Sequence, residues 1–163
     1  PSYEHTVVGE KSGHYAGEKN IRKYLVSGDK AGRKTPEYRR KVPAEFIHRV
    51  AHNDRDVVPG SGFHAETSWI WPEERSGLRG RAVTFVDPHT HAFPEIIGFF
   101  GSDFGDIHRL HGEVELWVEG KRYDIDRSFA AIIPEGVEHG PLTVRNVKRP
   151  IFHYTVGRAG LYA

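Results

Sequence analysis

The alternation of hydrophobic and polar positions differs on the two sides of residue 60. After that point, short apolar or alternating runs are separated by Gly, Pro and Asp, which is typical of strands joined by turns. The predicted strands span residues 64–71, 81–87, 95–101, 129–136 and 149–157, and residues 112–125 predict a hairpin that turns at Glu119-Gly120. Many short strands with closely spaced turn signals predict an all-β sandwich or barrel.

The N-terminal third differs in composition and in its hydrophobic pattern. Residues 1–42 are polar and rich in Gly, Lys and Arg, and they predict an extended arm in which HTVV (5–8) and KYLV (23–26) can each form an edge strand. Phe46, Ile47 and Val50 share a helical face, so a short helix is predicted over 42–52, beginning at Pro43. We therefore predict an N-terminal extension over residues 1–60 and a β-barrel domain over residues 61–163.

Composition narrows the classes of function. The chain has 163 residues, a formal net charge of +1 and no Cys, which fits one domain without disulfides or thiolate metal ligands. No apolar run approaches the roughly 20 residues that cross a bilayer, and no signal peptide is evident. Residues 1–50 hold eleven Lys/Arg against six Asp/Glu, which predicts either a basic arm or simply solvated surface lysines. We expect a cytoplasmic protein that binds neither nucleic acid nor membrane.

The segment PHTHAFPE, residues 88–95, brings two histidines and a glutamate close together. Residues i and i+2 of a strand point to the same face, so His89 and His91 present their imidazoles side by side. Pro94 is unfavourable inside a central strand and favours a turn. Glu95 then begins the next strand, and the turn returns its carboxylate to the two imidazoles.

A second segment, PEGVEH (134–139), supplies a further histidine after a tight turn. Together the two segments resemble the two-part signature of the cupins, H-x-H-x3-E followed by P-x-G-x2-H. The resemblance covers residues 65–160, about the whole predicted barrel, and implies a double-stranded β-helix, that is, a jelly-roll barrel. It also implies one metal ion inside the barrel, with the ligands His89, His91, Glu95 and His139.

A set of three imidazoles and one carboxylate suits one divalent transition metal. We expect Fe first, with Mn, Ni, Zn, Co and Cu as alternatives, because such a set does not select among them by affinity alone. Four protein ligands leave open positions for a substrate with two oxygens, or for one substrate atom and O2.

The residues around this centre are predicted from strand alternation. The expected pocket wall consists of Phe85, Phe93, Ile97 and Phe99. Arg109 lies at the end of a predicted loop over 101–110, where it either clamps an anionic substrate or is simply solvated. On the last strand either His153 or Tyr154 must face inward, so the candidate catalytic residues are Glu95, His153 and Tyr154. The remaining histidines, including His64, are read as surface or structural residues.

Three functions follow from these expectations. The first is a mononuclear non-haem metal enzyme of dioxygenase type that acts on a small oxygenated organic molecule. The second is a metal-dependent isomerase, decarboxylase or lyase that does not use O2. The third is a cupin that binds a metal or small ligand without turnover. The resemblance also implies a homodimer, formed through sheet edges or exchanged arms.

Overall fold

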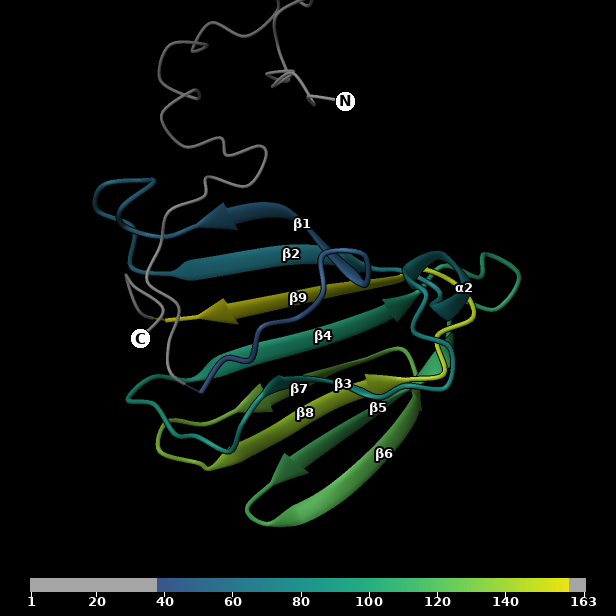
Figure 1. Cartoon of the computed structure of the whole chain (residues 1–163). Helices are drawn as coiled ribbons and strands as arrows, with labels where there is room; N and C mark the ends of the chain where they lie inside the picture. Colours follow the sequence, from purple (N-terminus) through teal and green to yellow (C-terminus); the bar gives the residue numbers. More distant parts are fainter. Residues whose placement is uncertain (1–37, 159–163) are drawn as a thin grey trace, which may run out of the picture.

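The computed structural model describes residues 38–158, which form two facing antiparallel sheets (Figure 1). The five-stranded sheet has the order β1 (Ile47–Asn53), β2 (His64–Ile70), β9 (Ile151–Gly157), β4 (Glu95–Gly101) and β7 (Phe129–Ile133). The four-stranded sheet has the order β3 (Val83–Val86), β8 (His139–Arg145), β5 (Arg109–Val118) and β6 (Lys121–Arg127). This is the all-β jelly-roll barrel that the sequence predicts.

The core lies between the two sheets because alternate side chains of each strand point inward. Every second residue of β2 is buried from His64 to Ile70, and the same holds from Leu110 to Leu116 in β5. Full burial of a large aliphatic or aromatic side chain stabilises the fold by about 1.5–3 kcal/mol. The side chains with no exposed surface include Ile70, Phe99, Leu110, Val114, Val144 and Ile151.

Most predicted strands are confirmed. β4 spans the predicted residues 95–101, and the 112–125 hairpin appears as β5 and β6. Its turn residues Glu119 and Gly120 have φ values of 50° and 71°. Positive φ at both central positions matches the twist of a two-residue hairpin, and Gly adopts it without strain.

The predicted helix over 42–52 is wrong. A turn closes from Pro43 to Phe46 and Ile47, and the chain then continues as strand β1. Phe46 enters the core, whereas Val50 is 42% exposed, so the two do not share a buried helical face. Pairing of β1 with the edge of β2 outweighs the local helical spacing. The predicted division at residue 60 stays a prediction, although β1 is hydrogen-bonded to β2 across it.

The described residues contain a short helix elsewhere, α2 (Glu73–Ser76), which ends at Gly77 in the left-handed region with φ 69°. Among the described residues, no helix combines the length and apolarity that a membrane crossing requires. The predicted strands HTVV and KYLV lie outside the described residues, and the homodimer stays a prediction.

Residues 38–42 form a strap that runs along β3 at the opening between the two sheets (Figure 1). The Arg40 amide donates to the carbonyl of Phe85 at 2.8 Å, and the Asp87 amide donates to the carbonyl of Tyr38 at 2.7 Å. The ring of Tyr38 stacks on that of His89 at a centroid distance of 3.7 Å. The strap is thereby fixed beside the histidine-rich segment.

Candidate metal centre

Backbone pairing brings the two histidine segments together. His89 and His139 exchange hydrogen bonds, with the His89 amide 2.9 Å from the His139 carbonyl and the reverse pair at 3.0 Å. The Gly136 amide donates to the carbonyl of His91 at 3.0 Å. Glu95 is the first residue of β4, as the turn at Pro94 predicts. Two segments far apart in the sequence therefore meet at one end of the barrel.

Backbone carbonyls fix the orientation of all three imidazoles. The Nδ1 atom of His89 lies 2.8 Å from the carbonyl oxygen of Asp87, and that of His91 lies 2.7 Å from the carbonyl oxygen of Phe93. The Nδ1 atom of His139 lies 3.0 Å from the carbonyl oxygen of Val137. A carbonyl oxygen only accepts, so Nδ1 carries the proton in each ring and Nε2 keeps its lone pair.

The Nε2 atoms converge on the Glu95 carboxylate. The ligand atoms of His89, His91, Glu95 and His139 all lie within 4.8 Å of one another. Oε2 of Glu95 is 3.3 Å from Nε2 of His139 and 3.5 Å from Nε2 of His91. None of the three Nε2 atoms, nor Oε1 of Glu95, has a hydrogen-bond partner among residues 38–158, although all are buried. Unsatisfied buried acceptors are costly, and a cation at their centre would satisfy all of them. The cluster can hold a metal ion.

The protonation states of His89 and Glu95 suit ligation, whereas burial acts to lower the pKa of His91 but contact with the Glu95 carboxylate raises it. Burial lowers the pKa of His89 to about 4, which keeps this imidazole neutral at physiological pH. Burial alone raises the pKa of Glu95, but contacts with His139, His64 and His91 outweigh it and hold the pKa well below its usual range. A neutral imidazole and an ionised carboxylate are the forms that bind metals.

The predicted wall residues lie in different places around the cluster. The ring of Phe93 stacks on His91 at 4.0 Å. Phe85 and Ile97 line a small cavity that also contains His89, Glu95 and His139. Phe99 is fully buried and stacks on the His153 ring at 4.2 Å, so it supports that ring from behind and does not line the cavity.

The two candidate residues of the last strand face opposite ways. His153 is buried, lines the cavity of the cluster, and its Nδ1 atom lies 2.9 Å from the carbonyl oxygen of Gly98. Burial lowers its pKa to about 4. Tyr154 lies on the other face of β9, where its ring stacks on the partly exposed Phe100 at 5.9 Å. Of the pair, only His153 is brought to the cluster.

Arg109 is far from the cluster along the strands. Glu95 begins β4, whereas the Gly101 backbone at the other end of β4 lies against the Arg109 carbonyl. A strand rises about 3.3 Å per residue, so the length of β4 separates Arg109 from the cluster. The loop before Arg109 therefore lies at the opposite mouth of the barrel, and Arg109 is not placed to clamp a molecule at the cluster.

The sequence analysis did not assign two residues that lie near the cluster. His64 is buried, with Nε2 3.8 Å from Oε1 of Glu95. Its position at the start of a predicted strand was the only signal of an inward orientation. Arg39 belongs to the strap and lines the cavity of the cluster from outside the barrel strands. Nothing in the sequence linked the strap to the cluster.

The sequence matches no family model, and no curated protein is similar to it. Solved structures are similar in fold only. Peruvianin-I, a cysteine peptidase from Thevetia peruviana latex, has 12% identity and a TM-score of 0.51 over 87% of this chain and 76% of that chain. A recombinant oxalate oxidase in complex with glycolate has 15% identity and a TM-score of 0.45 over 73% of this chain, which spans about half (54%) of the oxidase. KdgF from Halomonas sp. has 17% identity and a TM-score of 0.40 over 74% of this chain and 84% of that chain.

The jelly-roll of two antiparallel sheets carries both parts of the H-x-H-x3-E and P-x-G-x2-H signature, each at the start of a strand or at a strand-like bridge. The backbone pairs the two parts, and the four side chains of the signature meet inside the barrel. The chain is therefore a jelly-roll barrel that brings together the four side chains of the signature that resembles the cupins.

Proposed function

We propose that this protein is a mononuclear metal-dependent enzyme of dioxygenase type that acts on a small oxygenated organic molecule. The observation that carries the proposal is the convergence of three carbonyl-fixed imidazoles and one carboxylate, with their unpaired ligand atoms facing one another. The metal would be held by His89, His91, Glu95 and His139, and Fe(II) is our first choice.

When bound, such a metal supplies Lewis-acid polarisation of a substrate oxygen and, if it is redox-active, activation of O2. The chain supplies the surroundings. The carbonyls of Asp87, Phe93 and Val137 hold the imidazoles in one tautomer. Apolar side chains, including Ile97, Leu116 and Leu142, line the cavity and limit the access of water.

His153 favours a second candidate, a metal-dependent isomerase, decarboxylase or lyase. Its Nδ1–H donates to the Gly98 carbonyl, so Nε2 carries the lone pair, and the lowered pKa keeps the ring neutral. A neutral imidazole that lines the same cavity as Glu95 is a candidate general base for a proton transfer next to a polarised carbonyl.

Incubation with a panel of diketones, hydroxy acids and catechols, followed by mass spectrometry of products, tests both candidates. The protein is loaded with Fe(II), Mn(II) or Zn(II) and assayed in air and under argon, with an oxygen electrode in parallel. The dioxygenase proposal predicts a product that forms only with iron and only with consumption of O2. A product formed equally under argon supports the second candidate and contradicts the first.

A His139→Ala variant is the negative control for every assay, because it lacks one ligand, and a variant of the exposed His108 is the matched positive control. Metal binding without any product across the panel would favour a cupin that binds without turnover.

A further inference from the structure

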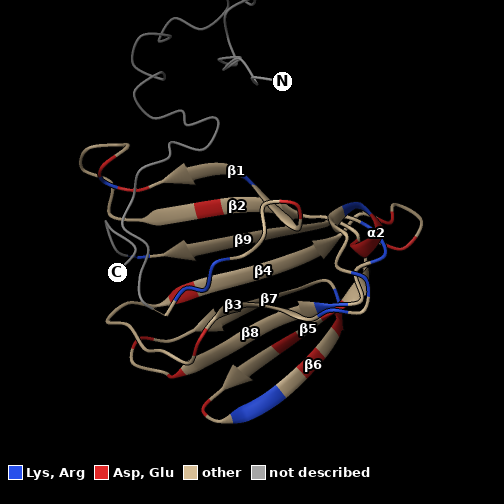
Figure 2. Ribbon diagram, in the orientation of Figure 1, with Lys and Arg blue, Asp and Glu red and all other residues tan. Residues whose placement is uncertain are grey.

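The two outer faces of the barrel differ in charge. On the four-stranded sheet, the outward side chains of β5, β6 and β8 form a network of ion pairs, and Figure 2 shows the charged residues along β5 and β6. Arg145 contacts Glu113, Glu115 and Asp124 at distances of 2.8 to 2.9 Å. Arg122 contacts Glu115 at 3.1 Å. Charged side chains paired in this way are typical of a sheet face that is exposed to water.

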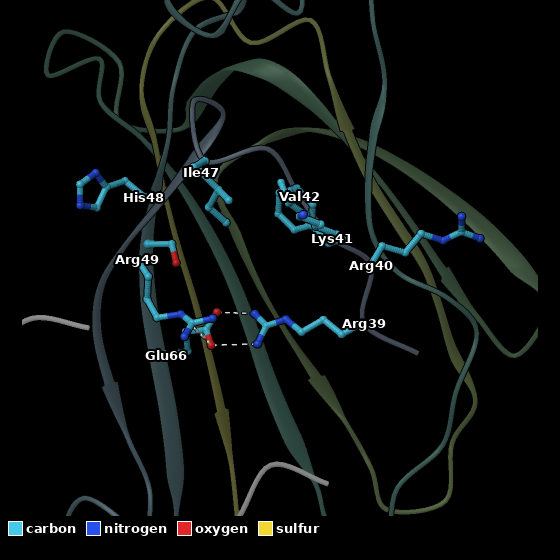
Figure 3. A pocket seen from close by; sticks show the side chains of 11 residues that line it. Arg39, Arg40, Lys41, Val42, Ile47, His48, Arg49 and Glu66 are labelled. Carbon is cyan, nitrogen blue, oxygen red and sulfur yellow. Dashed lines mark hydrogen bonds and ion pairs between the residues drawn. The ribbon is translucent and has the colours of Figure 1, made fainter. Parts of the chain in front are cut away.

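The strands of the five-stranded sheet present no charged side chain on their outward side. They contain three Lys, Arg, Asp or Glu residues in all, Arg49, Glu66 and Glu95. Glu95 belongs to the cluster inside the barrel, and Figure 3 shows Arg49 and Glu66 directed toward Arg39 of the strap. All three therefore point inward. We give the name aromatic face to the outward residues of β2, β9, β4 and β7, which are Ala65, Thr67, Trp69, Phe152, Tyr154, Val156, Ile96, Gly98, Phe100, Ala130 and Ile132.

Five aromatic rings form an unbroken series that crosses β2, β9 and β4. The ring centroid of Trp69 lies 5.3 Å from that of Phe152, which in turn lies 6.3 Å from that of Tyr154. Tyr154 and Phe100 are stacked at 5.9 Å. Trp71, just after β2, extends the series with a distance of 6.3 Å to Trp69. Rings at these separations attract one another, so the series is held in place and is preorganised for contact with a partner.

Gly98 keeps the aromatic face flat beside Tyr154. A Cβ atom at position 98 would overlap the Tyr154 ring, so the absence of a side chain allows this ring to lie across β4. Large apolar side chains around it are accessible to solvent, since Ile96 is 36%, Phe100 38% and Ile132 72% exposed. Contact of these side chains with water costs free energy that a partner covering the face would recover.

The outward surface of this sheet is large enough for a dimer interface. Strands lie about 4.8 Å apart and rise about 3.3 Å per residue, and the strands of this sheet are five to seven residues long. The projected area of the sheet is thus on the order of 500 Å², and the accessible area is larger because side chains project from it. A standard interface buries about 800 Å² on each partner, so the two areas are comparable.

The lack of charge favours a second copy of the chain as the partner. In a twofold dimer the same patch meets itself, so a charged side chain near the axis would face its own copy. The aromatic face contains no such side chain. A strongly charged partner, such as nucleic acid or an anionic membrane, would find no cation on this face to pair with. The centres of protein interfaces are enriched in Trp, Tyr and Phe and depleted of charged residues, as this face is.

We propose that the aromatic face is the interface of a homodimer in which two copies of the chain pack this face against each other. β9 is the middle strand of the sheet, so Phe152 and Tyr154 lie near the centre of the contact. The ligand atoms of the cluster lie inside the barrel, so both clusters remain uncovered. This interface does not require the metal and goes beyond the proposed function.

Sedimentation velocity of the full chain over a concentration series tests the proposal. The wild type should sediment as a dimer, with twice the 18.5 kDa mass of the chain. Tyr154→Lys should weaken association about 100-fold or more, because each copy would bury an unpaired ammonium group in the contact. Phe100→Lys should have the same effect. Phe100 is more exposed than Tyr154, so its substitution disturbs the fold of the monomer less.

Tyr123→Lys is the matched control, because it makes the same substitution at an exposed tyrosine of β6 in the other sheet. This variant should remain dimeric. Circular dichroism establishes which variants are folded, and Phe100→Lys decides alone if Tyr154→Lys does not fold.

A wild type that stays monomeric over the series would overturn the proposal, whatever else covers the aromatic face. A dimer that persists in the folded lysine variants of this face would overturn it too, and would place the contact at the sheet edges or in exchanged arms. Dissociation of Tyr123→Lys to the same extent would show that the effect of the lysine is not specific to the aromatic face, and would contradict the proposal as well.

Discussion

The Nε2 atom of His139 lies 3.3 Å from Oε2 of Glu95, and neither side chain exposes more than 2% of its surface. The Nδ1 proton of His139 is directed to the Val137 carbonyl, so a lone pair faces a carboxylate. Two acceptors at this distance require a proton or a cation between them. The same relationship is repeated between His91 and Glu95 at 3.5 Å. This arrangement is the physical basis for proposing a metal centre.

His64 is expected to position Glu95. Its Nε2 atom is 3.8 Å from Oε1 of Glu95, the carboxylate oxygen that faces away from His91 and His139. His64→Phe keeps a ring of similar size against Phe93 but removes the polar atoms. We predict about a 10- to 100-fold loss of metal affinity, the usual effect of removing a group that orients a ligand.

Competition with a chromophoric chelator measures this affinity. His48→Phe, which changes an exposed histidine, is the matched control. Wild-type affinity in the His64→Phe protein would rule out a positioning role for His64.

His153 gives stability a pH dependence. Its pKa in the folded protein is about 4, against an ordinary value of 6.5, so the unfolded chain binds the proton more tightly. This group therefore destabilises the fold progressively as pH falls from about 6.5 to about 4, by up to roughly 3 kcal/mol. Above pH 6.5 it contributes no pH dependence.

Urea unfolding of chelator-treated wild type and His153→Phe at several pH values between 4 and 7 checks this prediction. The stability of the wild type relative to the variant should fall toward acid pH. Parallel pH profiles for the two proteins would show that His153 is not buried as a neutral ring.

Substitutions of Gly98 and Tyr154 test whether Tyr154 lies on the face of β9 that points away from the cluster. The two residues are paired between β4 and β9, and a Cβ atom at position 98 would overlap the Tyr154 ring. Gly98→Ala should destabilise the protein by about 1–3 kcal/mol. Combining it with Tyr154→Ala should recover part of that loss, because the obstructing ring is gone.

A double-mutant cycle by urea unfolding measures the recovery. Metal content should be unchanged in all four proteins, since Tyr154 points away from the cluster. Strictly additive losses, or loss of metal in Tyr154→Ala, would contradict this placement.

The features predicted correctly depend on local pattern. The alternation of apolar and polar residues predicts β4 and the β5–β6 hairpin. The turn at Pro94 predicts that Glu95 lies beside the two histidines. The helix over 42–52 failed because Phe46, Ile47 and Val50 suit a helix and a strand about equally, and the partner strand decides.

The residues that were misplaced or missed depend on distant contacts. Which of His153 and Tyr154 faces inward follows from the register of β9 between β2 and β4. Arg109 and Arg39 lie at opposite ends of the barrel because of the path of the chain, which no local pattern reveals. The arginine that lies near the cluster is therefore Arg39 of the strap, and not Arg109 of the loop.

Elemental analysis of the purified protein, after incubation with Fe(II), Mn(II) or Zn(II) and gel filtration, tests the central claim most directly. Wild type and the His108→Ala control should each retain about one equivalent of metal, and His139→Ala should retain little or none. A wild type that retains no metal, or a His139→Ala protein that retains a full equivalent, would contradict the account.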